Sequence, residues 1–247
     1  MNVGVVFQPA GVPGLNMFAD FYDIEITNLI GSIGAQLILN GCYDGSNPGY
    51  CNLIDRLPTG FVDDLRNTTN NVGMLETSGL EVGGSYSFST AYGDFALGVD
   101  ARSLDSYDVT LANGDIQAAA GYVLGSSRDN FVDFKMNTSL TWTMGDMFAS
   151  ATLQHFGEGK GVANNPPTTN PAGDVTKETE RDIDAITYLD LQYGMVLPEY
   201  NATVRIGVDN VLDEDPTFFP ETFANDFDPA YRTWGSMHWY ANVSVNF

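Results

Sequence analysis

Basic residues are scarce in this sequence. Its 247 residues include 10 Lys and Arg against 32 Asp and Glu, which gives a formal net charge of -22, and none of the basic residues cluster. Because binding to phosphates requires basic patches, this charge argues against a nucleic-acid partner. The length is enough for one large domain, and the hydrophobic content of 43% is ordinary for a folded protein.

Long hydrophobic runs are also missing. No apolar stretch reaches the roughly 18 residues that a transmembrane helix requires, so a β-barrel is the remaining way for the chain to span a bilayer. The start, Met1 to Gln8, lacks the basic region and cleavage site of a secretory signal. We therefore expect either a cytosolic protein or the downstream piece of a longer one.

Cysteine and histidine are nearly absent, with two of each. Cys42 and Cys51 bracket a turn-rich segment, which predicts a local disulfide and an oxidising compartment; two buried free thiols are the alternative. A bridge of this span would stabilise the protein by roughly 2–3 kcal/mol. Neither His155 nor His238 is near the cysteines in sequence, so we expect no metal site and no cofactor.

The last eleven residues, Met237 to Phe247, alternate strictly between apolar and polar side chains, which indicates a β-strand. One face carries Trp239, Ala241, Val243, Val245 and Phe247; the other carries His238, Tyr240, Asn242, Ser244 and Asn246. A strand in lipid has this pattern, with aromatic residues at the two water boundaries, where Trp239 and Phe247 would lie. The alternative is an edge strand of a soluble sandwich.

Eight further segments alternate in the same way. They are residues 2–8, 15–26, 80–88, 95–102, 133–142, 149–154, 188–195 and 202–209. The connections are short at 9–14, 89–94, 144–146 and 198–200, and long at 27–70, 105–130, 157–184 and 213–236. The first long connection contains one short apolar segment, Ile33 to Leu39, that could form a helical turn or two. Short turns at one end and long loops at the other are typical of an outer-membrane barrel.

The polar faces of these segments carry charged residues that suit a wet lumen and not a packed core. They are Glu81, Asp100, Arg102, Asp133, Lys135, Asp190, Arg205 and Asp209. Bacterial barrels close with an even number of strands, whereas nine are expected here. The sequence therefore predicts an all-β, antiparallel, incomplete barrel, open along both edges, with upstream strands missing.

Four groups of motifs resemble the C-terminal barrel portion of TonB-dependent outer-membrane receptors. They are Gly4–Pro9 with Pro13–Leu15 and Asp20–Glu25; Asn71–Gly73 with Thr77–Glu81; Gly207–Asp213 with Pro216; and Asp228–Pro229 with Arg232. The resemblance covers essentially all of residues 1–247, and the paired cysteines are placed as in such receptors. One departure is Ala230-Tyr231-Arg232, where the family has Gly-Arg after Asp-Pro.

The resemblance implies a Gram-negative outer-membrane protein in contact with lipid and lipopolysaccharide. The plug domain and the segment that contacts the TonB complex have no counterpart, so this would be about nine of the family's twenty-two strands. It implies a small-molecule ligand, a link to the TonB complex through the missing N-terminal part, and contact with the barrel assembly machinery through the C-terminal strand, including Trp239, Tyr240 and Phe247.

The leading functional hypothesis is TonB-energised uptake of a scarce ligand, such as an iron chelate, a vitamin or an oligosaccharide. The alternatives are a passive porin or adhesin barrel, and a secreted sandwich that binds sugar through Trp142, Trp234 or Trp239. We do not expect an enzyme, because no Ser-His-Asp or metal-ligand spacing occurs.

The final long loop interleaves acidic and aromatic residues. Its candidate ligand-vestibule residues are Asp213, Asp215, Phe218, Phe219, Asp226, Asp228, Tyr231 and Arg232. Such a loop would focus a negative potential over about one Debye length, roughly 8 Å at physiological salt. The alternative is an acidic rim that divalent cations bridge to lipopolysaccharide, with the aromatic residues packing the loop against its neighbours.

Overall fold

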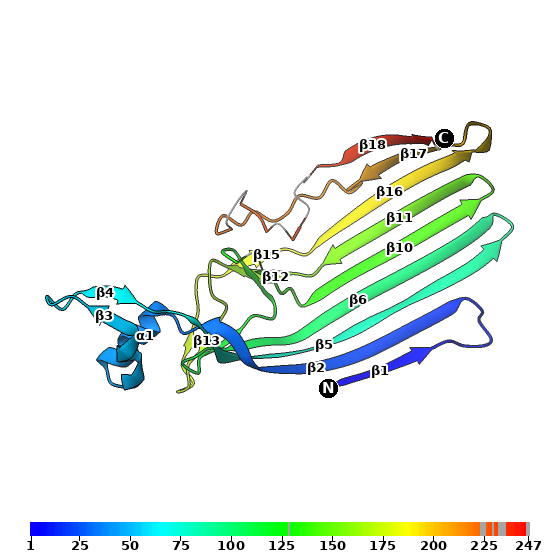
Figure 1. Ribbon diagram of the computed structural model, residues 1–247. Helices are drawn as coiled ribbons and strands as arrows, with labels where there is room; N and C mark the ends of the chain where they lie inside the picture. The colour runs from blue at the N-terminus through cyan, green and yellow to red at the C-terminus, as the bar shows by residue number, and fades with distance from the viewer. Residues whose placement is uncertain (128, 223–225, 229, 232–235, 246–247) are drawn as a thin grey trace.

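The computed structural model of the protein describes residues 1–247 except 128, 223–225, 229, 232–235 and 246–247. Its main element is a curved antiparallel sheet in which nine strands of the described chain follow one another (Figure 1). They are β1 (Asn2–Phe7), β2 (Leu15–Ser32), β5 (Thr69–Thr90), β6 (Gly93–Thr110), β10 (Phe134–Met144), β11 (Met147–Phe156), β16 (Ile186–Leu197), β17 (Ala202–Asp209) and β18 (His238–Val245). β1 and β18 form the two edges, so the predicted open nine-strand sheet is confirmed.

The connections are sorted by length, as the sequence predicts. Short turns join the strands at one end, on the right in Figure 1, and the last of them contains the 3-10 helix η2 (Pro198–Tyr200). The long connections gather at the other end, which we call the loop end. Among the described residues, no helix is long and apolar enough to cross a membrane.

The first long loop is shorter than predicted. Residues 27–70 were expected to be loop, but β2 continues to Ser32 and β5 already begins at Thr69. Between them lie α1 (Ala35–Tyr43), η1 (Pro48–Leu53), β3 (Ile54–Arg56) and β4 (Val62–Leu65). β6 likewise runs to Thr110, beyond the predicted end at residue 102. The outward positions of these strand ends include Thr27, Glu76 and Asp108, so the ends do not resemble a strand in lipid. On β6 the two faces exchange at a register shift between Leu104 and Ser106.

The second and third long loops also contain short strands where the sequence predicted loop. They are β7 (Ile116–Ala118), β8 (Tyr122–Leu124), β9 (Asp129–Asn130), β12 (Gly159–Val162), β13 (Thr168–Thr169), β14 (Val175–Thr176) and β15 (Arg181–Ile183). β15, β12, β8 and β9 form a separate four-stranded sheet, while β7 pairs with β6 and then with β13. Neighbouring loops are therefore joined through their backbones.

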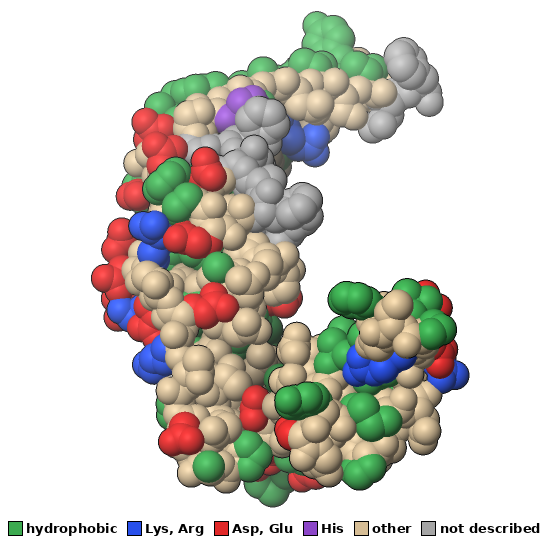
Figure 2. All heavy atoms as spheres, turned by 90° about the vertical axis from the view of Figure 1, so that its left-hand side faces the viewer, with side chains coloured by type: hydrophobic (Ala, Val, Ile, Leu, Met, Phe, Trp, Pro, Cys, Tyr) green, Lys and Arg blue, Asp and Glu red, His purple; other side chains and the backbone are tan. Residues whose placement is uncertain are grey.

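The two faces of the main sheet differ in chemistry. Residues that pair directly across strands share a face, so the register Phe21–Leu80–Ser103 belongs to one face and Asp20–Glu81–Arg102 to the other. The apolar face, called the outer face below, also carries Val82 and Leu97. The charged face is called the inner face. Seen from the loop end, the sheet bends into an open C (Figure 2).

Aromatic residues gather on the outer face beside the short turns. The Phe88 ring lies 5.0 Å from that of Tyr86 and 5.2 Å from that of Phe95, measured between ring centroids. Trp142 donates from Nε1 to the carbonyl oxygen of Tyr92 at 2.6 Å. A girdle of aromatic side chains with polar partners at the turns is typical of a barrel at a membrane–water boundary.

Several aromatic side chains of the inner face lie over glycines of the neighbouring strand. The pairs are Tyr22 over Gly79, Phe18 over Gly83, Phe148 over Gly194 and Tyr240 over Gly207. In each pair a Cβ atom on the glycine would meet the ring. Because glycine has no side chain, a large ring can pack against its backbone, and this packing fixes the register of the adjacent strands.

Candidate ligand vestibule at the loop end

A buried apolar cluster ties the last three long loops together. Its members are Val123, Val132, Ile183, Ile186, Tyr188, Phe219 and Tyr231, with Phe156 packed against them. Phe156, Ile186 and Tyr188 lie on β11 and β16, and the others come from the loops. Phe219 is 1% exposed, and a Cβ on Gly161 would collide with its ring. The loops on this side of the sheet therefore form one packed body.

Asp228 is buried beside this cluster, with 2% of its surface exposed. Its carboxylate accepts a hydrogen bond from Asn130 Nδ2 at 2.5 Å and another from the backbone N–H of Ala230 at 2.9 Å. Burial raises the pKa of the nearby Tyr231 hydroxyl to about 12. Because Asp228, Phe219 and Tyr231 are all buried, these three candidates take part in the packing of the loops.

The remaining candidates of the final loop are distributed differently. Asp213, Asp215 and Asp226 are exposed, and Phe218 is 65% exposed. Asp213 also accepts a hydrogen bond from the backbone N–H of Met237 at 2.7 Å, next to the start of β18. Arg232 lies outside the described residues. A ligand vestibule in this loop stays a prediction.

The C-terminal candidates occupy both faces of β18. Trp239 is 70% exposed on the outer face, where it pairs with Val208. Tyr240 lies over Gly207 on the inner face, and its hydroxyl accepts a hydrogen bond from Gln192 Nε2 at 2.8 Å. Phe247 lies outside the described residues. A role of this strand in assembly stays a prediction.

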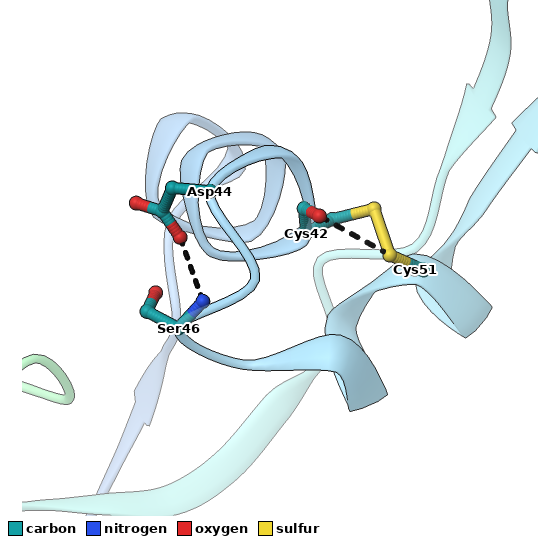
Figure 3. The surroundings of a disulfide bond; sticks show 4 residues. All are labelled: Cys42, Asp44, Ser46 and Cys51. Carbon is teal, nitrogen blue, oxygen red and sulfur yellow. Dashed lines mark hydrogen bonds between the residues drawn. A yellow bond between two sulfur atoms is a disulfide. The ribbon is translucent and has the colours of Figure 1, made fainter.

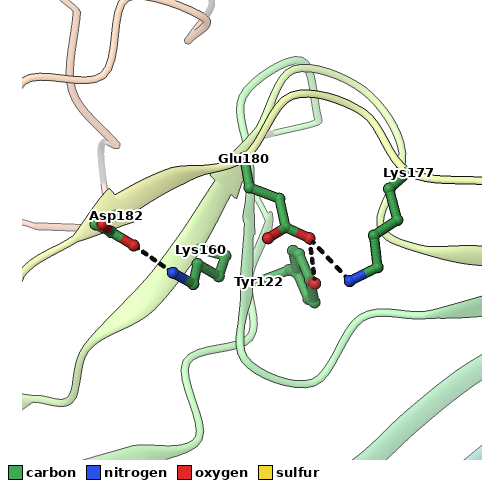
Figure 4. Close-up of polar contacts among 5 residues, drawn as sticks. All are labelled: Tyr122, Lys160, Lys177, Glu180 and Asp182. Atoms are coloured by element: carbon green, nitrogen blue, oxygen red, sulfur yellow. Dashed lines mark hydrogen bonds and ion pairs between the residues drawn. The ribbon is translucent and has the colours of Figure 1, made fainter.

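Charged contacts reinforce the loop body at its surface (Figure 4). Tyr122 donates from its hydroxyl to Glu180 at 2.9 Å, and Lys177 approaches the same carboxylate to 3.4 Å. The hydrogen bond from Tyr122 is the main cause that lowers the pKa of Glu180. Lys160 pairs with Asp182 across β12 and β15. Such exposed pairs contribute little stability individually, so most of the stability of the packed loops comes from the apolar cluster.

Comparisons with known proteins agree with this architecture. The family described as TonB dependent receptor-like, beta-barrel, matches residues 1–211. The chain belongs to this family of receptors. No curated protein matches the sequence.

Solved structures with the same fold include two siderophore receptors. A mutant of the ferric enterobactin receptor PfeA from Pseudomonas aeruginosa matches with a TM-score of 0.59 and 16% identity, over 100% of this chain and 30% of that one. The siderophore receptor PirA from Acinetobacter baumannii matches with a TM-score of 0.59 and 10% identity, over 98% of this chain and 30% of that one. This receptor-barrel chain thus spans about a third of the length of the structures it matches.

The predicted disulfide of this receptor-barrel chain is present, with Cys42 and Cys51 bonded at an S–S distance of 2.06 Å (Figure 3). Cys42 lies on α1 and Cys51 on η1, so the disulfide links the two short helices of the first long loop. Asp44 accepts a hydrogen bond from the backbone N–H of Ser46 at 2.8 Å in the intervening turn. The bridge lies at the loop end, as the sequence predicts.

Removing both cysteines with Cys42→Ser and Cys51→Ser is expected to destabilise this loop locally. On the loop-entropy estimate the loss is about 2–3 kcal/mol. The first long loop should then be cleaved faster by added protease, because the bridge is the covalent link between α1 and η1. The barrel should keep its resistance to unfolding in detergent. Unchanged cleavage of residues 33–68 would contradict the expectation.

The described residues contain no group of three His, Cys, Asp or Glu side chains placed to hold a metal ion. The family to which the chain belongs consists of receptors and transporters, not enzymes. What the arrangement offers chemically is a charged inner face beside a set of packed loops.

Proposed function

We propose that this chain is part of the wall of an outer-membrane receptor of a Gram-negative bacterium that takes up a scarce ligand with energy from the TonB complex. An iron chelate is the first candidate, since the similar PfeA and PirA structures are siderophore receptors. The observation that carries the proposal is the match of the receptor-barrel family to residues 1–211.

The division of the sheet into an apolar and a charged face supports a place in the wall of an outer-membrane barrel. Five outward positions on β5, from Phe88 to Leu80, are apolar or glycine and extend about 27 Å along the strand at roughly 3.4 Å per residue. At the roughly 35–45° tilt of such strands, this length spans about 19–22 Å of the membrane normal, somewhat less than the roughly 25 Å apolar band of outer-membrane barrels. Lipid and lipopolysaccharide would surround this band, while the charged inner face would border the lumen.

The remaining parts of the receptor would supply what this chain lacks. In this proposal residues 1–247 form the C-terminal barrel portion, and a plug domain and further strands precede them. The TonB complex would act through that N-terminal part. The assembly machinery would bind β18 during insertion, and a small-molecule ligand would enter at the loop end.

Uptake by cells that express the full-length receptor tests the proposal. Iron-starved cells would be supplied with radiolabelled ferric catecholates and ferric hydroxamates in turn. We expect receptor-dependent uptake of one class, lost both in receptor-deficient and in TonB-deficient cells. Uptake that persists without TonB would instead indicate a passive porin, the second candidate, and no uptake of either class would remove iron chelates as the ligand.

We also propose that Asp215, Phe218 and Asp226 form an open, acidic part of the vestibule. The double variant Asp215→Asn, Asp226→Asn is expected to weaken binding of a cationic chelate and to reduce the dependence of this binding on salt, because both carboxylates are exposed. Binding to the full-length receptor would be measured at low and high salt. Unchanged affinity and salt slope would leave the acidic residues as a rim that divalent cations bridge to lipopolysaccharide.

A further inference from the structure

A groove lies on the outer face of the sheet, centred on β11, and its volume is about 390 Å³. In the cross-strand register Ala149 lies between Trp142 and Tyr193. Ala151, the next outward residue of β11, lies between two leucines of the same neighbouring strands. Because alanine is much smaller than these partners, the two alanines form the floor of the groove and the larger side chains form its walls.

The groove provides apolar contacts and no charge. None of the described residues that line it is charged. Trp142 bounds it near the short turns, and the hydrogen bond from its indole N–H to the carbonyl oxygen of Tyr92 fixes the ring there. Trp239, which is 70% exposed, bounds it on β18. An occupant must therefore be apolar along its length, which excludes ions, sugars and lipid headgroups.

The groove runs obliquely to the membrane. It reaches from β10 across β11, β16 and β17 to β18, and five strands about 4.8 Å apart give a length of roughly 19 Å. Trp142 lies close to the short turn after β10, whereas Val208, the partner of Trp239, lies near the loop end of β17. With strands tilted by roughly 35–45°, the groove rises by about 11–14 Å, which is within the roughly 15 Å of one leaflet.

Other parts of a receptor would not fill this groove. The further strands of the proposed receptor would extend the sheet from its edges, β1 and β18, and would leave the outer face of β11 and β16 free. A second copy of the chain is a poor fit, because a symmetric contact would set groove against groove and enclose a void. The groove covers roughly 7 Å by 19 Å, far below the roughly 800 Å² per partner of a stable protein interface.

We propose that the groove holds one acyl chain of a phospholipid from the periplasmic leaflet, with the glycerol end beside Trp142 and the methyl end toward Trp239. This inference rests on the proposed function, which places the chain in the outer membrane with its short turns on the periplasmic side. An acyl chain in the bilayer is already out of water, so the hydrophobic effect does not favour the groove over bulk lipid. Dispersion contacts with the floor and walls do, because they are small singly and add up along the chain.

Native mass spectrometry of the full-length receptor tests the proposal. The receptor would be released from nanodiscs of phosphatidylethanolamine, and the phospholipid molecules that stay bound would be counted. We expect the parent receptor to retain one phospholipid. The double variant Ala149→Leu, Ala151→Leu fills the floor of the groove with apolar atoms and should retain about tenfold less, which corresponds to a loss of about 1.4 kcal/mol.

The matched control is Ala19→Leu, Ala101→Leu. These two alanines lie on either side of Val82 on the same outer face but do not line the groove, so retention should equal that of the parent. Electrophoresis without boiling would confirm that both double variants are folded.

A parent receptor that retains no phospholipid would overturn the proposal, as would equal retention in the Ala149→Leu, Ala151→Leu variant. A receptor dimer that this variant abolishes would also overturn it and would assign the groove to a second copy. The measurement uses neither a chelate nor the TonB complex, so failure of the uptake proposal is recognised separately by the transport assay.

Discussion

The substitution Phe219→Ala is expected to release the packed loops from one another while the barrel stays folded. Phe219 is 1% exposed, lies in the buried cluster and fills the space above Gly161. Replacing a fully buried Phe by Ala costs about 3–5 kcal/mol, which exceeds what the exposed ion pairs of the loops can offset. Hydrogen exchange should therefore accelerate in β8, β12 and β15, but not in β10, β11 or β16 near the short turns.

Phe218→Ala is the matched control for this expectation. The two residues are adjacent, but Phe218 is 65% exposed, so its removal leaves no cavity. Hydrogen exchange of the full-length receptor would be compared for the two variants and the parent. Equal protection of β8, β12 and β15 in both variants would show that the cluster does not hold the loops.

The substitution Gly79→Val is expected to block assembly of the barrel. A Cβ at Gly79 would lie 2.5 Å from the backbone oxygen of Ser103 and 2.5 Å from the Tyr22 hydroxyl oxygen. The Tyr22 ring could rotate away, but the backbone of β6 could not move without breaking its ladder to β5. Overpacking costs about 1–3 kcal/mol and occasionally more, and a contact with backbone that cannot yield belongs at the upper end of this range, so less folded receptor should accumulate in the membrane.

Gly11→Val carries the same change at a site with open space. No atom lies within 4 Å of the position of its Cβ, and Gly11 lies in the turn between β1 and β2. The folded fraction of each variant would be measured by its resistance to unfolding during electrophoresis without boiling. Normal amounts of folded Gly79→Val receptor would contradict the tight approach of β2, β5 and β6.

The sequence predicted the part of the fold that depends on local pattern. Strand and turn order follow from alternation and from turn residues, which need no knowledge of distant contacts, and Cys42 and Cys51 are close in sequence. The ends of β2, β5 and β6 nearest the long loops were missed because their outward positions, such as Thr27, Glu76 and Asp108, are polar and do not match a lipid-facing pattern. The run from Asp23 to Thr27 still alternates, and that signal identifies a strand whose faces have exchanged polarity.

The candidate site depended on contacts that no local pattern contains. The carboxylate of Asp228 accepts a hydrogen bond from Asn130, which is 98 residues away in sequence. Phe219 packs against Gly161 of β12. An acidic residue among aromatic residues in a loop looks the same whether it faces a ligand or supports the packing. Separating the exposed Asp215 and Asp226 from the buried Asp228 therefore required the fold.

The outer face of the sheet should contact lipid from Leu80 toward the short turns, and water from Leu80 toward the loop end. A spin label tests this boundary at single cysteines introduced by Val82→Cys, Glu81→Cys and Glu76→Cys in the full-length receptor, reconstituted in a bilayer. We expect oxygen dissolved in lipid to reach a label at position 82, and a water-soluble nickel complex to reach labels at positions 81 and 76. A label at position 76 that is protected from the nickel complex and reached by oxygen would contradict it.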